Sequence, residues 1–161
     1  MTTNKNGNSQ ARTLVIYFSR TGQTRAVAQQ LASLTKATVF ELETKQSLPT
    51  DMYAVADWAT QQYENQQFPA LRQLPAIDGF DRILIGSPIW SGRLATPVVS
   101  LLQSSNFQQQ QVGVFATSVG QYGQFEHDVV TFVKAQRSLP ALLLDGAQVT
   151  DDLLNGWLTQ K

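Results

Sequence analysis

Cysteine is absent from this sequence of 161 residues, and histidine occurs once, as His127. Without cysteine the chain can form no disulfide, no thiolate metal site and no thiol nucleophile. With one imidazole and no thiolate available, we expect no dedicated transition-metal site. The lack of cysteine fits a cytoplasmic protein, and the cytoplasm is the location that we expect.

Charge and long apolar runs are scarce as well. Charged residues make up 15% of the chain, and 12 basic residues balance 12 acidic ones. A nucleic-acid-binding domain carries a basic face, so we expect no nucleic-acid partner. No apolar run approaches the roughly 20 residues of a membrane-spanning helix, so we expect no membrane span.

The length and the hydrophobic content of 42% suit one globular domain with a substantial core. Residues 1–12 are polar and lack the apolar centre of a signal peptide. We therefore expect a disordered N-terminal tail over residues 1–12 and a single domain over residues 13–161.

Short apolar runs of strand length recur along the chain, and helical patterns separate them. The runs are Thr13–Phe18, Thr38–Leu42, Arg82–Gly86, Val112–Ala116 and Ala141–Leu144. Continuously apolar strands are typical of a sheet that is covered on both faces. Strands that alternate with helices predict parallel pairing through right-handed crossovers. The predicted fold class is α/β, a doubly wound three-layer sandwich.

Apolar residues at helical spacing indicate where the helices lie. They are found at Val27, Ala28, Leu31 and Leu34, at Phe125, Val129, Phe132 and Val133, and at Leu153, Leu154, Trp157 and Leu158. A shorter helix is expected over about 95–103, with Pro97 in its first turn, and a crossover helix over 50–66. The glutamine run Gln108–Gln111 is expected to be a polar connection.

The first apolar run ends in a hydroxyl-rich loop, SRTGQT at residues 19–24, that leads directly into a helix. Helix N-termini offer unpaired N–H groups and a partial positive charge, and serine and threonine add further donors. The loop has neither the glycine-lysine pattern of nucleotide triphosphate sites nor the Gly-x-Gly-x-x-Gly pattern of dinucleotide sites. A single terminal phosphate suits it, although residues that merely cap a helix would give the same pattern.

Two further loops follow the third and fourth predicted strands. They read GSPIWSGRLATP over residues 86–97 and TSVGQYGQ over residues 117–124, and each contains one large aromatic residue, Trp90 or Tyr122. In this fold class ligands bind beyond the carboxyl ends of the strands, where the strand order reverses. Aromatic rings above a phosphate loop indicate a flat ring system bound by stacking, although such a tryptophan is often a packing residue.

These three loops resemble the FMN-binding loops of the flavodoxin-like family, and the resemblance runs from about Thr13 to Leu158. It implies a five-stranded parallel sheet of order 2-1-3-4-5 and FMN as the cofactor, with Trp90 against the flavin ring and Gly92 leaving a peptide free to face its N5 atom. The implied FMN-binding residues are Ser19, Arg20, Thr21, Gly22, Gln23 and Thr24 in the first loop, Ser87, Pro88, Ile89, Trp90, Ser91 and Gly92 in the second, and Thr117, Ser118, Val119, Gly120, Tyr122 and Gly123 in the third.

The resemblance also implies a role in electron transfer. If the flavin carries the redox chemistry, the protein needs no catalytic acid or base of its own. We hypothesise that Arg20 and Arg93 favour an anionic reduced flavin, and therefore an NAD(P)H-dependent reductase of quinone-like acceptors. A one-electron carrier that is reduced by a partner reductase and serves another protein is the alternative. Either role is compatible with a monomer or a homodimer.

A serine hydrolase is an alternative from another class, because Ser118 stands in ATSVG, one substitution from a Gly-x-Ser-x-Gly elbow. In that fold an acid and then a distant histidine follow the serine, whereas His127 lies within the next predicted helix. This order disfavours a hydrolase and predicts a surface position for His127. For Tyr53, core or surface packing is favoured, although its ring could reach the edge of the flavin.

Overall fold

The computed structural model describes residues 11–118, 123–145 and 149–160. The first ten residues of the predicted tail, and Val119, Gly120 and Tyr122 of the third loop, lie outside the described residues. The strands are β1 (Thr13–Tyr17), β2 (Thr38–Glu41), β3 (Arg82–Trp90), β4 (Arg93–Leu94), β5 (Phe107–Ser118), β6 (Ala135–Ser138) and β7 (Leu142–Asp145). The helices are α1 (Gln23–Thr35), α2 (Met52–Asn65), α3 (Thr96–Gln103), α4 (Phe125–Phe132) and α5 (Asp151–Leu158).

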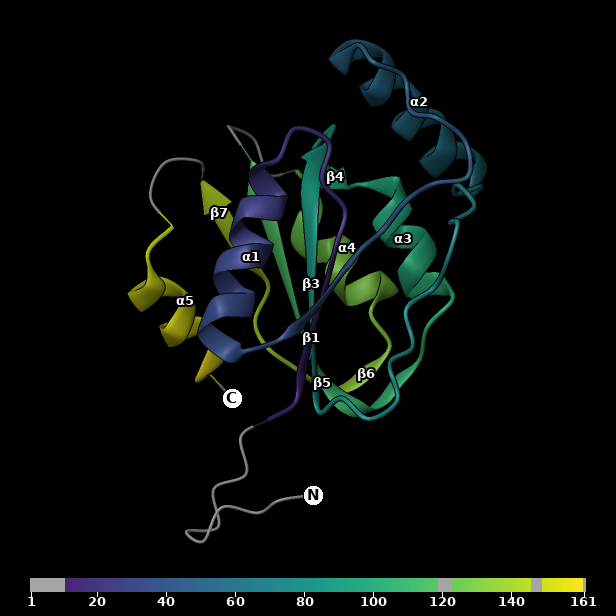
Figure 1. Cartoon of the computed structure of the whole chain (residues 1–161). Coiled ribbons are helices and arrows are strands. Elements are labelled where there is room, and N and C mark those ends of the chain that lie inside the picture. The colour runs from purple at the N-terminus through teal and green to yellow at the C-terminus, as the bar shows by residue number, and fades with distance from the viewer. Residues whose placement is uncertain (1–10, 119–122, 146–148, 161) are drawn as a thin grey trace, which may run out of the picture.

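Among the described residues these strands form one sheet of order β2-β1-β3-β5-β6, with β4 on β3 and β7 on β5 (Figure 1). Strands β1, β2, β3, β5 and β7 are the five that the sequence predicts. The pairs β1–β2, β1–β3, β3–β5 and β5–β7 are all parallel, so the predicted order 2-1-3-4-5 is confirmed. The carboxyl ends of these strands share the upper edge of the sheet in Figure 1.

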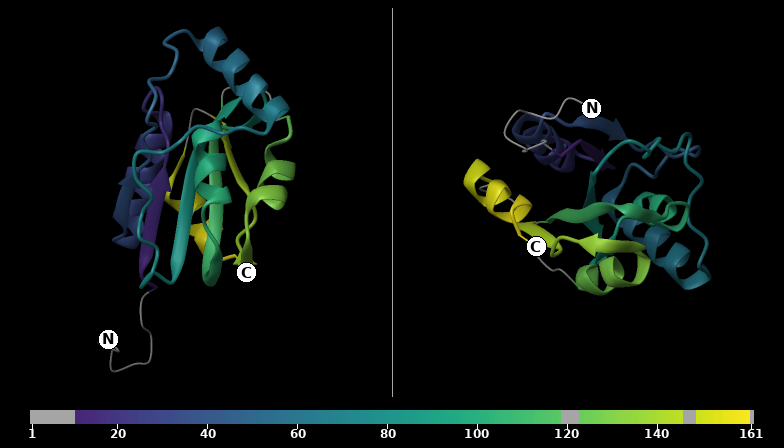
Figure 2. Two further views of the ribbon diagram at one scale, coloured as in Figure 1. Left: turned by 90° about the vertical axis from the view of Figure 1, so that its right-hand side faces the viewer. Right: turned by 90° about the horizontal axis from the view of Figure 1, so that it is seen from below.

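Helices lie on both faces of the sheet (Figure 2), and each face carries an apolar core, as the continuously apolar strands predict. Successive side chains of a strand point to opposite faces, and β1 shows this alternation directly. Leu14 and Ile16 belong to the core shared with α2, α3 and α4, whereas Val15 and Tyr17 belong to the core under α1 and α5. Within the described part of the chain, no helix combines the length and apolar character needed to cross a membrane.

Strand β5 is longer than its apolar run predicts. It begins at Phe107 and includes the glutamine run that we expected to be a connection. Phe107, Gln111 and Val112 pair with β6, and Gln111 also pairs with β3, so backbone pairing holds both ends of the glutamine run in the sheet. Gln110 is buried and its side chain donates to the Ile77 carbonyl, while Gln108 and Gln109 are exposed. Side-chain polarity therefore misled the prediction where backbone pairing determines the structure.

The fifth strand is divided, which the sequence pattern did not predict. Both β6 and β7 run parallel to β5, β6 along its first half and β7 along its second. Pro140 lies between them and has no N–H to donate, so the ladder is interrupted there. The helical pattern that included Val133 ends at Phe132, because Val133 has an extended backbone (φ −81°, ψ 120°).

Close packing between the sheet and its helices predicts a difference between two glycine substitutions. A Cβ at Gly86 would lie 2.3 Å from Phe115 Cζ, inside the fully buried core, whereas a Cβ at Gly156 in α5 would meet no atom within 4 Å. We expect Gly86→Ala to lower the free energy of unfolding by about 1–3 kcal/mol through overpacking.

The matched control, Gly156→Ala, should raise the free energy of unfolding by about 0.5–1 kcal/mol, because alanine favours a helix. Urea unfolding of the flavin-free protein measures both changes. Equal effects of the two substitutions would contradict this packing.

Candidate functional site

The first predicted loop connects β1 to α1 as a turn that leaves the helix end open. Gly22 occupies the N-cap position with φ +100°, and its N–H donates to Ser19 Oγ at 3.0 Å. The first turn of α1 contains no acidic residue, so the positive end of the helix dipole is not neutralised. A Cβ at Gly22 would meet nothing within 4 Å, so there is open space for a ligand above this residue.

The hydroxyl groups of this loop have different roles. Thr24 is buried, and its hydroxyl is hydrogen-bonded to that of Thr117 at 2.8 Å, which ties the loop to the end of β5. The Ser19 hydroxyl accepts the Gly22 N–H described above, while Thr21 is exposed. Of the predicted hydroxyl donors, Ser19 and Thr24 thus shape the loop, and Thr21 faces outward.

The second loop is a tight hairpin between β3 and β4. Ser91 and Gly92 both have positive φ, 52° and 75°, as a two-residue type I′ turn requires. Trp90 before the turn is only 7% exposed and packs against Phe18, with ring centroids 5.5 Å apart, and against Trp58 at 6.5 Å. Trp90 therefore anchors the hairpin in the core and offers a small part of its surface to a ligand.

Ser87 takes part in the same anchoring. Its hydroxyl donates to the Pro88 carbonyl at 2.7 Å and accepts the Ala95 N–H at 3.0 Å. These bonds join the end of β3 to the start of α3, and Ser87 is fully buried. It lies behind the second loop.

The second and third loops touch through their backbones. Gln124 N–H donates to the Gly92 carbonyl at 2.7 Å. A Cβ at Gly123, which has φ +48°, would lie 2.5 Å from that carbonyl oxygen, so the close approach requires glycine. The described part of the third loop is thus held in register with the hairpin.

The three loops and the start of α2 enclose one cavity of about 410 Å³ at the carboxyl edge of the sheet, which we call the central cavity. Ten of the predicted residues line it: Arg20, Thr21, Gln23, Pro88, Ile89, Trp90, Ser91, Gly92, Thr117 and Ser118. Ser19, Gly22, Thr24, Ser87 and Gly123 are predicted residues outside this lining and shape the loops around it. The fold thus brings predicted residues from three separate segments together at one site.

Helix α2 supplies the rest of the lining, of which sequence reasoning considered Tyr53 alone. Met52, Tyr53, Val55 and Ala56 border the central cavity, and α2 stands over the carboxyl edge of the sheet (Figures 1 and 2). Tyr53 is 75% exposed, so it has no place in the core, and it lies on the surface at the edge of the cavity. The helical pattern over residues 50–66 placed α2 in the chain, but nothing in that pattern indicates where a long crossover helix lies in space.

Arg93 and Asp128 form an ion pair directly behind the hairpin. Asp128 is fully buried, and it accepts hydrogen bonds from Arg93 Nε at 3.2 Å, Arg93 Nη2 at 2.6 Å and the Leu94 N–H at 3.2 Å. The Arg93 guanidinium lies 3.6 Å from the ring centroid of Tyr63. Tyr63 donates its hydroxyl to the Leu94 carbonyl at 2.6 Å. We call Tyr63, Arg93 and Asp128 the hairpin clamp, since they join α2, β4 and α4.

The clamp corrects the hypothesis for Arg93. The hydrogen bond with Asp128 raises the pKa of Arg93, so the cation is held by a carboxylate and cannot serve as a free charge for a ligand. Burial, with the negative charge of Asp128, raises the pKa of Tyr63 and keeps its hydroxyl a donor. Arg20 remains available, because its hydrogen bond to the Thr50 carbonyl, at 2.8 Å, neutralises no charge.

The hydrolase alternative finds no support at this site. Ser118 ends β5 and lines the central cavity, whereas His127 is exposed on α4, as predicted. Over the described ranges no hydrogen bond connects Ser118 with His127. The neighbouring acid, Asp128, is committed to Arg93.

The clamp predicts a large loss of stability on removal of one charge. Asp128→Asn leaves Arg93 without its partner, and we expect it to cost on the order of 2–3 kcal/mol. This is below the roughly 3–5 kcal/mol of a fully buried pair, because Arg93 is 28% exposed. Glu43→Gln removes one charge of the exposed Arg72–Glu43 pair and should cost less than about 1 kcal/mol. Chemical unfolding of both variants measures the difference, and equal losses would contradict the role of the clamp.

Comparison with known proteins agrees with this geometry. A family model described as flavodoxin matches residues 12–161. A flavoprotein from Lactobacillus acidophilus NCFM, crystallised in complex with FMN, is 27% identical, with a TM-score of 0.73 over 92% of this chain and 99% of that one. A candidate flavoprotein from Bacteroides uniformis is 25% identical, with a TM-score of 0.75 over 94% and 100% of the two chains.

More distant structures share the fold alone. Oxidised flavodoxin 2 from Bacillus cereus is 18% identical, with a TM-score of 0.54 over 91% of this chain and 92% of that one. No curated protein matches the sequence. The family match covers the three loops, α2 and the hairpin clamp together, and the chain belongs to the flavodoxin family.

Proposed function

We propose that this protein binds FMN, with the phosphate on the first loop and the flavin ring in the central cavity, and acts as an NAD(P)H-dependent reductase of quinone-like acceptors. The observation that carries the reductase assignment is the charge of the cavity lining. Among the residues that the structure describes, the lining contains one arginine, Arg20, and no carboxylate. A negative charge that a ligand gains on reduction is therefore not opposed by a charge of the same sign.

The residues present fit the phosphate of FMN. The open space above Gly22, the unneutralised N-terminus of α1 and the exposed Thr21 provide donors at one end of the site. The remainder of the lining is mostly apolar or backbone, with Tyr53 and Trp90 as aromatic surfaces. An elongated ligand with one anionic end and one flat end matches this distribution.

When bound, FMN would supply the two-electron redox chemistry between a nicotinamide donor and a quinone-like acceptor. The protein's contribution is orientation and electrostatics. The hairpin clamp fixes the Ser91–Gly92 turn, and the Gln124–Gly92 hydrogen bond fixes the third loop against it. Tyr53 on α2 is exposed at the edge of the same cavity, where it is placed to cover a flat ring.

Gly22 tests whether the first loop binds the phosphate. Gly22 has φ +100°, a conformation that costs any other residue roughly 1–2 kcal/mol, and relief of that strain would turn the N–H groups of α1 away from the phosphate. We expect Gly22→Ala to weaken FMN binding about tenfold, measured by quenching of flavin fluorescence. Gly156→Ala, the same change in an exposed helix, should leave the dissociation constant unaltered. An unchanged affinity in Gly22→Ala would argue against this loop as the phosphate site.

Arg20 tests whether a positive charge in the cavity lining stabilises the reduced flavin. At a separation of about 8 Å and an effective dielectric near 20, Arg20 would stabilise one negative charge by about 2 kcal/mol before solvent screening. Arg20→Gln should therefore lower the two-electron midpoint potential by some tens of millivolts, since about 30 mV corresponds to 1.4 kcal/mol.

Arg137→Gln is the matched control. Arg137 lies in β6, beside the first half of β5 and away from the cavity edge, so the potential should stay the same. Anaerobic titration followed by absorbance gives both potentials and also tests the alternative role. Accumulation of a stable one-electron-reduced form, with no consumption of NAD(P)H, would favour a carrier that serves a protein partner.

A further inference from the structure

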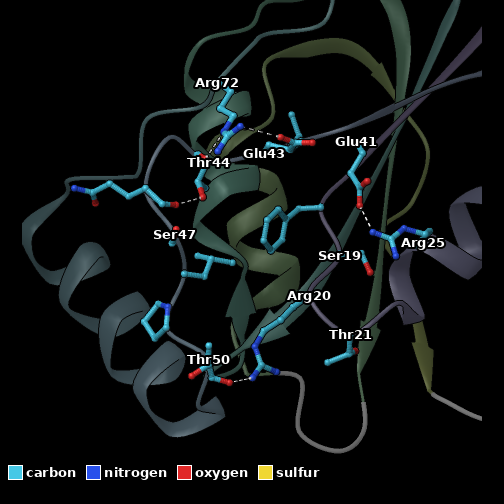
Figure 3. Close-up of a pocket in the computed structure, with 15 residues that line it drawn as sticks. Ser19, Arg20, Thr21, Arg25, Glu41, Glu43, Thr44, Ser47, Thr50 and Arg72 are labelled. Atoms are coloured by element: carbon cyan, nitrogen blue, oxygen red, sulfur yellow. Dashed lines mark hydrogen bonds and ion pairs between the residues drawn. The ribbon is translucent and has the colours of Figure 1, made fainter.

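A second cavity lies beside the first loop, on the side of β2 (Figure 3). It measures about 610 Å³ and is bordered by residues 18–21, by the end of β2 and by the segment 42–50 that follows. We call it the lateral cavity. Its volume is in the range of sites for nucleotide-sized molecules, roughly 300–1,000 Å³. The flavin ring proposed above does not occupy it, because the second and third loops and Tyr53 border the central cavity and only the first loop borders both cavities.

The two cavities meet at the first loop. Arg20 and Thr21 line both of them. The Arg20 side chain crosses from the loop to the segment after β2, where it donates to the Thr50 carbonyl at 2.8 Å (Figure 3). A molecule that occupied the lateral cavity and extended toward the flavin would thus pass the Arg20 guanidinium.

Among the described residues that line the lateral cavity, the arginines outnumber the carboxylates by one. Arg25 pairs with Glu41, and Arg72 pairs with Glu43 at 3.7 Å, so these four charges balance (Figure 3). Arg20 contributes the remaining positive charge, next to the boundary between the cavities. A guanidinium group binds phosphate oxygens through two parallel hydrogen bonds, which makes this boundary suitable for a pyrophosphate.

Two carboxylates stand where β2 ends. Glu41 and Glu43 follow the glycine of the first loop by about 20 residues, the spacing at which dinucleotide-binding folds place an acidic residue to accept a ribose hydroxyl. In this protein, too, the two carboxylates lie beside that loop, since both line the lateral cavity. An acid at this place favours a free 2′-hydroxyl, whereas a 2′-phosphate needs an unpaired arginine.

The apolar part of the lateral cavity suits the base of a nucleotide. Leu48 and Pro49 are half-buried in the wall of the lateral cavity, and Leu42 is buried beneath it. A base needs such an apolar surface, with hydroxyl and carbonyl groups around its edge. Thr44, Ser47 and Thr50 provide polar groups in the same wall.

We propose that the lateral cavity binds the adenosine half of the nicotinamide dinucleotide, with the pyrophosphate at Arg20, and that Glu41 and Glu43 select NADH over NADPH. The inference deepens the proposed function and rests on it, because a nicotinamide donor is required only by a reductase. The same adenosine chemistry would also be supplied by FAD in place of FMN, and the experiment separates the two.

The experiment titrates the FMN-loaded protein by calorimetry with ADP-ribose, which lacks the nicotinamide and cannot react. We expect one ADP-ribose to bind per chain while the flavin stays bound, and 2′-phospho-ADP-ribose to bind about tenfold more weakly. Release of the flavin on binding, or tighter binding of FAD than of FMN with no binding of ADP-ribose, would overturn the proposal.

Glu43→Gln tests the selectivity. This substitution frees Arg72 for the 2′-phosphate, so the tenfold difference between the two probes should shrink toward equality. Glu64→Gln, an exposed change on α2 outside both cavity linings, is the charge-matched control and should leave the ratio unchanged. A ratio in Glu43→Gln equal to that of the unaltered protein would refute the assignment of Glu43.

A separate assay of NADH oxidation distinguishes the two proposals. If ADP-ribose binds but NADH is not oxidised in the presence of a quinone, the reductase function is wrong while the adenosine site stands. If NADH is oxidised and ADP-ribose neither binds nor inhibits, the reductase function stands and the lateral cavity is not the site.

Discussion

The site depends on a change of direction in the sheet between β1 and β3. The chain leaves β1 toward the face covered by α1 and leaves β3 toward the face covered by α3, so the carboxyl ends of these two strands border the central cavity, with the start of α2 on its other side. The end of β5 comes next to the end of β3 through seven paired residues, Arg82↔Gln111 to Pro88↔Thr117. Backbone pairing of β1, β3 and β5 thus brings the three loops that follow these strands to the carboxyl edge of the sheet.

Most of the conspicuous polar side chains at this edge hold the protein together. Thr24 bonds to Thr117, Ser87 to Pro88 and Ala95, and Arg93 to Asp128. What remains for a ligand is largely backbone N–H groups, the open space above Gly22 and aromatic surface. Side-chain hydrogen bonds within the protein therefore order the loops, and the ordered loops present the groups that a flavin requires.

Charge at the edge follows one pattern. Three carboxylates near the loops each pair with an arginine, in the pairs Arg25–Glu41, Arg72–Glu43 and Arg93–Asp128. Arg20 donates to the Thr50 carbonyl instead, and it lies at the boundary between the two cavities. One cation of this kind serves both proposals, since a reduced flavin and a pyrophosphate are each anionic. The net charge of zero for the whole chain gives no hint of this local excess.

The sequence by itself determined the α/β class, because buried parallel strands are apolar throughout. Its resemblance to the flavodoxin-like family implied the strand order and ten of the residues that line the central cavity. It did not reveal the strand character of the glutamine run or the division at Pro140, since backbone pairing decides both. The role of Arg93 and the place of α2 also required the tertiary structure. Arg93 meets Asp128, 35 residues further along the chain, and Tyr53 reaches the cavity only because α2 stands over the sheet edge. Contacts between distant segments decide which charges are free and which rings are exposed, and local patterns carry no record of them.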